Sequence, residues 1–129
     1  MRSNKIKTTI LLVLCLLLTI STVHAQTFET TISDILANPD KYDHEMVQVE
    51  GKVIAPKFNT STKGNPYTTF KLSDAAGRTL NVFDPGTLSI KEGDIVRVCG
   101  SYRKFEFAMR QYTFCYEIDA SWGSVARIR

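Results

Sequence analysis

Two runs of alternating apolar and polar residues, 95–103 and 112–120, constrain the fold of this chain more than any other feature. In the second run Tyr112, Phe114, Tyr116 and Ile118 fall on one face and the intervening residues on the other. Period-two alternation of this kind is typical of strands with one buried face. The sequence therefore predicts one long β-hairpin over residues 93–120.

One antiparallel register of this hairpin meets several requirements together. It places Cys99 opposite Cys115, so that a disulfide can join the two strands. It also gives the following facing pairs: Arg97 with Glu117, and Val98 with Tyr116. A slip by one residue would turn every side chain to the wrong face. We therefore predict this register and a Cys99–Cys115 disulfide.

Residues 1–25 have the pattern of a secretory signal. A basic start is followed by an apolar run over residues 6–20 and by Val23-His24-Ala25, small residues typical of a cleavage site. The apolar run is short for a membrane span. The sequence predicts cleavage after Ala25, export to the periplasm or the cell exterior, and no membrane span in the remaining chain.

The net charge changes when this segment is removed. The chain has 16 basic and 13 acidic residues, and residues 1–25 contain three of the basic ones, Arg2, Lys5 and Lys7, and no acid. The remaining chain is therefore formally neutral. This balance excludes a uniformly basic nucleic-acid-binding surface, so any such surface would have to be local.

The chain after residue 25 reads as one domain with a short helix before its strands. Residues 26–44 form a lead-in and a helix that Thr31 caps and that ends before Pro39, and the helix is expected to plug one end of a barrel. Residues 45–120 form the barrel, in which Gly51 marks a bend. The predicted strands span residues 46–55, 67–72, 78–83, 95–103 and 112–120. Residues 121–129 form a tail that is either a short strand or a packed segment.

Five strands, grouped as three and then two, with a plugging helix, predict an all-β, OB-fold-like Greek-key barrel. Four segments of the sequence also resemble those of exported bacterial OB-fold domains, a group that is mostly uncharacterised. The segments that carry this resemblance are 34–42 (DILANPDKY), 49–53 (VEGKV), 70–74 (FKLSD) and 90–98 (IKEGDIVRV). The resemblance covers most of residues 31–120 and implies the fold more than a function.

OB-folds bind ligands on the outer face of their second and third strands, flanked by two loops. The candidate residues on this face are Tyr67, Thr69, Lys71, Asn81 and Phe83. The candidates at one rim are Phe58, Lys57 and Lys63, and those at the other are Arg103, Lys104, Phe105, Phe107 and Arg110.

This surface is open to more than one interpretation. We favour a non-enzymatic binding module whose partner is a protein, a glycan or a small ligand. The alternative is single-stranded nucleic acid, because rings stack on bases and cations meet phosphates. In the plainest interpretation Tyr67 and Phe83 are a cross-strand aromatic pair, and the aromatic residues at the hairpin tip pack on the tail.

The sequence offers little for catalysis or metal binding. His44 is the only histidine after residue 25, so no Ser/His/Asp set can be assembled. We therefore expect no catalytic residues, no metal and no cofactor. A metal-dependent hydrolase is a third and less favoured hypothesis.

Overall fold

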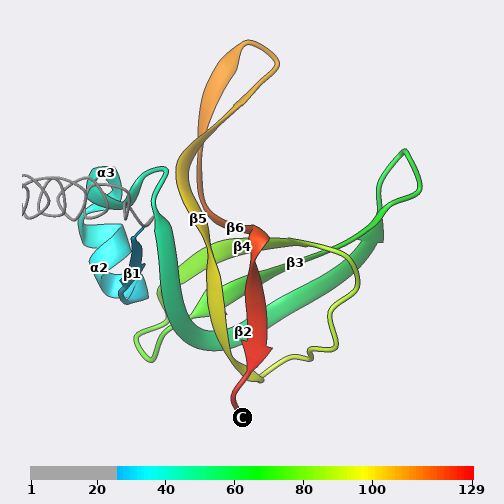
Figure 1. Cartoon of the computed structure of the whole chain (residues 1–129), viewed down its shortest axis with the longest axis horizontal. Coiled ribbons are helices and arrows are strands. Elements are labelled where there is room, and N and C mark those ends of the chain that lie inside the picture. The colour runs from blue at the N-terminus through cyan, green and yellow to red at the C-terminus, as the bar shows by residue number, and fades with distance from the viewer. Residues whose placement is uncertain (1–25) are drawn as a thin grey trace, which may run out of the picture.

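The computed structural model describes residues 26–129 (Figure 1). The predicted signal peptide, residues 1–25, lies outside the described residues. The elements in chain order are β1 (Thr27–Glu29), α2 (Ile32–Ala37), α3 (Pro39–Tyr42), β2 (Met46–Thr60), β3 (Pro66–Ser73), β4 (Thr79–Pro85), β5 (Ile95–Ala108) and β6 (Gln111–Arg127). Within this part of the chain no helix is both long and apolar enough to cross a bilayer.

The strands form one sheet that closes on itself. Their order is β1-β2-β3-β4-β6-β5, and β2 pairs with β5 to complete the ring. The β4–β6 pair is parallel, whereas β2–β3, β3–β4, β5–β6 and β2–β5 are antiparallel. This is the Greek-key barrel of an OB-fold. The predicted fold is confirmed.

Strand β2 bends, and its two halves pair with different strands of the ring. Its first half, Met46 to Lys52, pairs with β5, and its second half, from Lys52 onward, pairs with β3. The partner changes next to Gly51, where a Cβ atom would lie 2.7 Å from Leu72 Cγ. A side chain at position 51 would therefore push β2 off β3, which explains the glycine predicted to mark a bend.

The core lies inside the barrel, and the helical segment covers one end of it. Alternating residues of the five barrel strands point inward and are buried, among them Val47, Val98 and Ile118. Ile32 and Ile35 of α2 join the same cluster. The Thr31 side chain caps α2 by accepting a hydrogen bond of 3.1 Å from the Asp34 amide. The predicted cap and plugging helix are both present.

Two segments are more regular than the sequence indicated. The lead-in contains β1, which pairs in parallel with the start of β2. The tail belongs to β6, whose residues 124–127 pair with β5. The predicted helix is followed by a second short helix, α3, which buries Tyr42.

The predicted hairpin is present, but its register is wrong. Near the tip, facing residues are Phe107 with Tyr112 and Phe105 with Phe114, and the turn is at Met109 and Arg110. The register then shifts twice, between Arg103 and Phe105 and between Cys99 and Ser101. The observed facing pairs therefore differ from the predicted ones. Arg97 faces Ala126, Val98 faces Val125, Cys99 faces Ser124 and Glu117 faces Arg103.

The predicted disulfide is absent for the same reason. Both Cys99 and Cys115 are free thiols. Cys115 lies beside Arg103, to whose carbonyl its thiol donates a hydrogen bond of 3.3 Å. Cys99 is four residues further along the strand, roughly 13 Å away at the rise of a β-strand. A disulfide needs Cα atoms within about 7 Å.

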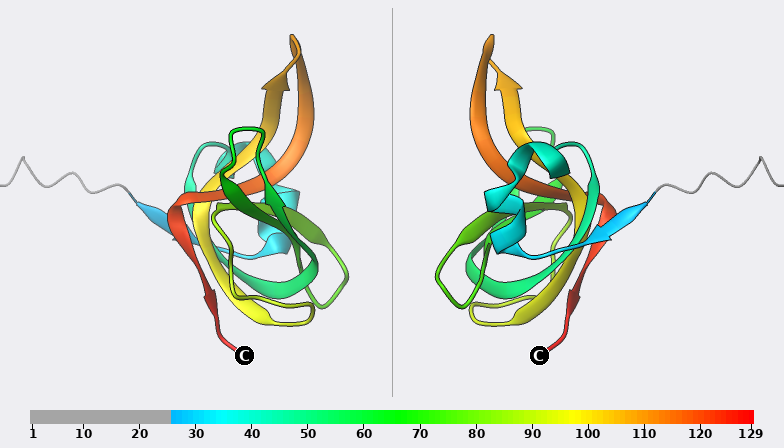
Figure 2. Two further views of the ribbon diagram at one scale, coloured as in Figure 1. Left: turned by 90° about the vertical axis from the view of Figure 1, so that its right-hand side faces the viewer. Right: turned by 90° about the vertical axis from the view of Figure 1, so that its left-hand side faces the viewer.

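The distal part of the hairpin, residues 104–116, leaves the barrel as a two-stranded arm. Figures 1 and 2 show it projecting from the ring of strands, with its tip far from the body of the molecule. Tyr112 and Phe114 were predicted to share a buried face. They are instead exposed, because the arm extends past the sheet against which they would have packed.

The passage of β6 across β5 depends on glycine. Four β6 residues, 120–123, lie between the pairs Ser101–Asp119 and Cys99–Ser124 and are opposed by Gly100 alone. A Cβ atom at Gly123 would lie 1.8 Å from the Cys99 carbonyl oxygen. The two backbones are therefore too close for any side chain at this position.

We expect Gly123→Ala to lower the free energy of unfolding by about 2 kcal/mol or more, because the backbones of β5 and β6 must separate. Urea denaturation measures the loss. Ser124→Ala, one residue along and exposed, is the control and should change stability by less than about 0.5 kcal/mol. Equal stability of the two variants would contradict the close crossing.

Candidate functional site

The outer face of β3 and β4 carries the residues predicted for ligand binding. Their neighbours Thr68, Phe70, Leu72, Leu80 and Val82 are buried in the barrel. The alternating residues Tyr67, Thr69, Lys71, Asn81 and Phe83 therefore point outward. The register brings Thr69 opposite Phe83 and Lys71 opposite Asn81.

Two aromatic rings lie side by side on this face. The centroids of Tyr67 and Phe83 are 5.8 Å apart, and the ring planes are inclined by 31°. Both side chains are partly exposed. They form the diagonal cross-strand pair that the sequence predicts, and they also present ring surface to solvent.

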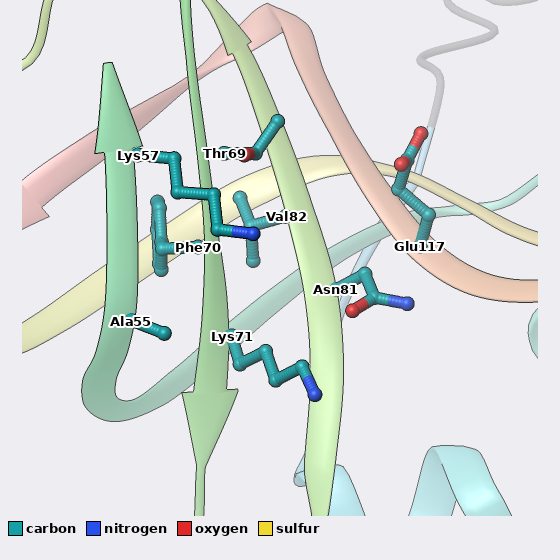
Figure 3. A pocket seen from close by; sticks show the side chains of 8 residues that line it. All are labelled: Ala55, Lys57, Thr69, Phe70, Lys71, Asn81, Val82 and Glu117. Atoms are coloured by element: carbon teal, nitrogen blue, oxygen red, sulfur yellow. The ribbon is translucent and has the colours of Figure 1, made fainter. Parts of the chain in front are cut away.

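A hollow of about 220 Å³ lies beside these rings and is shared by four strands. Figure 3 shows the polar side chains around it: Lys57 from β2, Thr69 and Lys71 from β3, Asn81 from β4 and Glu117 from β6. Phe70 and Val82, whose side chains are buried in the barrel, also contribute to its wall. The hollow therefore presents two cations, a hydroxyl, an amide and one carboxylate.

A bulge in β2 places Lys57 at this hollow. The β2–β3 register shifts between Ile54 and Lys57, and Ala55 has a positive φ of 50°. The Ala55 amide, which the bulge removes from the ladder, donates a 2.7 Å hydrogen bond to the Glu92 carboxylate. Bulges of this kind redirect side chains next to functional sites.

The charged side chains around the face differ in whether they already form an ion pair. Within residues 26–129, Lys57, Lys63 and Lys71 form no ion pair, so their ammonium groups are available to an anionic ligand. Arg103 is paired with Asp119 at 2.6 Å. Lys104 is paired with Asp40 and lies 4.8 Å from the centroid of the Phe105 ring.

Asn81 is held in one orientation by the neighbouring strand. Its Nδ2 donates a 2.8 Å hydrogen bond to the Cys115 carbonyl. Its Oδ1 is then free to accept a hydrogen bond from a ligand.

Glu117 is the one carboxylate at the hollow. Burial raises its pKa above the ordinary value, and the nearby carboxylates of Glu106 and Asp119 act in the same direction, whereas Arg103 lowers it. Burial and the Glu117 charge also raise the pKa of the Cys115 thiol, so this thiol is protonated at neutral pH.

The structure divides the predicted residues between three locations. Thr69, Lys71 and Asn81 line the hollow, and Tyr67 and Phe83 lie beside it on the same face. Phe58 and Lys63 belong to the β2–β3 hairpin, where Phe58 is half exposed. Arg103 and Phe105 line a separate hollow of about 570 Å³ at the base of the arm, with Asp43 and His44.

Sequence reasoning missed Glu117 as a site residue, because the wrong register paired it with Arg97. It also missed the partners of the tip aromatics. These rings do not pack on the tail; they pack on one another along the arm. In residues 26–129 no group of three His, Cys, Asp or Glu side chains is arranged to hold a metal ion.

No protein-family model matches the sequence, and no curated protein matches it. Among solved structures, this chain is similar to a chain in the crystal structure of yeast Stn1 and Ten1. The TM-score is 0.59 and the identity is 11%, and the match covers 88% of this chain and 69% of that chain. It is also similar to the second OB-fold domain of replication protein A from Methanococcus maripaludis, with a TM-score of 0.45 and 17% identity over 67% of this chain and 87% of that chain. At such identities the first likeness shows a shared fold.

We expect Glu117→Gln to be more stable than the wild type at neutral pH. When folding raises the pKa of an acid, the folded state holds the proton more tightly than the unfolded state does. Ionisation of Glu117 therefore lowers the stability of the wild type as the pH rises above 4.5, the ordinary pKa of a glutamate. The difference between the two proteins should disappear below that pH. Urea denaturation between about pH 4 and pH 7 measures it.

The matched control is Glu45→Gln, which changes an exposed acid that forms no ion pair in the described chain. Its stability relative to the wild type should not follow this pH course. A Glu117→Gln variant that tracks the wild type at every pH would contradict the burial of a charged carboxylate at the hollow.

Proposed function

We propose that this protein is a non-enzymatic binding module that holds single-stranded nucleic acid on the outer face of β3 and β4. The observation that carries the proposal is the partly exposed pair of rings, Tyr67 and Phe83, next to two lysines without ion-pair partners in residues 26–129. They lie on the face where OB-folds bind oligonucleotides and oligosaccharides.

The rings supply the sequence-independent part of the affinity. Stacking of a base on an aromatic side chain contributes about 1–3 kcal/mol, and every base has a face that can stack. The tilt of 31° between Tyr67 and Phe83 leaves the two rings inclined rather than coplanar. This arrangement suits two successive bases that are splayed apart.

The lysines supply the electrostatic part. Lys57 and Lys71 stand on adjacent strands beside the rings, so a backbone that crosses the hollow would pass both ammonium groups. Asn81 Oδ1 is free to accept a hydrogen bond from a base amino group. The Glu117 carboxylate repels a phosphate at one wall, so the binding is expected to be weak. Its affinity should fall with salt by the modest slope that two cations give.

The same proposal places the protein outside the cytoplasm. Its support is the composition of residues 1–25, a basic start followed by an apolar run and small residues. The ligand would then be an extracellular or periplasmic single strand.

We expect Tyr67→Ala and Phe83→Ala each to weaken binding of a labelled thymidine oligonucleotide about tenfold, because each removes one stacking platform. Fluorescence anisotropy at low and moderate salt measures the affinity. Lys71→Ala should lower the slope of log affinity against log salt by about one.

Two variants control for general effects of losing a ring or a charge. Trp122→Ala removes a ring that is 94% exposed and belongs to another part of the surface, and Arg97→Ala removes a cation already paired with Glu50 at 2.8 Å. Both should bind as the wild type does. Absence of binding at low salt, or binding that Tyr67→Ala, Phe83→Ala and Lys71→Ala all leave unchanged, would contradict the proposal.

A further inference from the structure

Four of the seven large hydrophobic side chains that are exposed in residues 26–129 lie at the tip of the arm. The exposed fractions are 61% for Phe107, 95% for Met109, 74% for Tyr112 and 55% for Phe114. These residues are neighbours in the β5–β6 register or adjoin its turn. A contiguous apolar patch of this kind marks a site of interaction with a protein or a membrane.

The turn at the tip is unusual in its residues. Met109 and Arg110 have φ values of 52° and 65°, so both are in the left-handed region. Two-residue hairpin turns of this conformation strongly favour Asn-Gly, because other side chains are strained there. The chain instead places a long apolar side chain and a long cationic one at the outermost point, which indicates that these side chains serve a function.

The arm has two different faces. The facing pairs Phe107–Tyr112 and Phe105–Phe114 lie on one face, and Glu106–Thr113 and Ala108–Gln111 lie on the other. The rings of the first face contact one another in sequence, with centroids 4.9 Å apart for Phe107–Tyr112 and 4.4 Å for Phe105–Phe114. The rings of this face therefore pack on one another within the arm.

The charges at the tip favour an apolar surface over an anionic polymer. Residues 107–116 contain one cation, Arg110, and no acid. The nearest acid along the chain, Glu106, belongs to the opposite face. A nucleic acid on the arm would need several cations along its path. The two cations at the base of the arm, Arg103 and Lys104, are paired with Asp119 and Asp40.

We propose that the tip of the arm inserts into the interface of a phospholipid bilayer. Phe107 and Met109 would enter the acyl boundary, Tyr112 would lie at headgroup level with its hydroxyl in water, and Arg110 would meet lipid phosphates. The outer edges of the arm carry unpaired backbone groups, which limits insertion to the headgroup region, where water satisfies them. This surface is separate from the β3–β4 face.

The projection of the arm makes this insertion sterically simple. Figures 1 and 2 show the tip standing clear of the barrel and of the β2–β3 hairpin. The tip can therefore enter a flat surface while the β3–β4 face remains in water.

Flotation of residues 26–129 with vesicles of phosphatidylethanolamine and phosphatidylglycerol tests the proposal. The key variant combines Met109→Asn with Arg110→Gly, which installs the favoured turn residues and removes both tip side chains. We expect it to be at least as stable as the wild type and to lose at least about tenfold in vesicle affinity. Phe107→Ser should lose a similar factor. Trp122→Ser, an equally apolar change on the barrel, should lose nothing.

A fluorescent reporter gives the depth and orientation. The chain has one tryptophan, Trp122. In a Trp122→Phe background, Phe107→Trp should shift its emission to the blue when vesicles are added, whereas native Trp122 should not. Replacing the anionic lipid by phosphatidylcholine should weaken binding by no more than about fivefold, because the tip has a single cation.

The remaining outcomes all overturn the proposal. One is the absence of vesicle binding. Another is vesicle binding that the tip variants leave unchanged. The third is concentration-dependent self-association in sedimentation that the tip variants abolish while vesicles stay unbound, which would assign the arm to a second copy of the chain.

Discussion

The change of partner along β2 is the constraint on which the rest of the barrel depends. One continuous strand pairs with β5 through its first half and with β3 through its second, and both pairings include Lys52. Only a residue without a side chain fits at position 51, where β2 rests on Leu72. Because this bend closes the ring, it also sets the outward direction of β3 and β4, and hence the face that presents Tyr67 and Phe83.

Period-two alternation was enough to predict five strands, and Leu80, Val82, Val96 and Val98, which the alternation directs inward, are buried. The same pattern failed in the arm, where Tyr112 and Phe114 are exposed. The register of β5 with β6 could not be predicted, because β6 carries extra residues at two points. The turn gave no signal either, since Met109 and Arg110 stand where Asn-Gly would have marked the centre of the hairpin.

The candidate site was predictable to the extent that it depends on adjacent strands. Tyr67 and Phe83 follow from the β3–β4 hairpin, whose short turn settles its register. Glu117 enters the same site through the parallel β4–β6 pairing, which joins segments distant in sequence. No local pattern reports such a pairing. Lys57 was predicted at one rim of this face, and the bulge at Ala55 is what turns it into the hollow.

The position of β6 in the ring also has a consequence for biogenesis. β4 and β5 do not pair with each other, and β6 lies between them. A nascent chain that has not yet released residues 111–127 therefore leaves one edge of each of these strands open, and its apolar interior faces water. Closure of the ring therefore requires β6, and the barrel is completed only after residues 111–127 have been released.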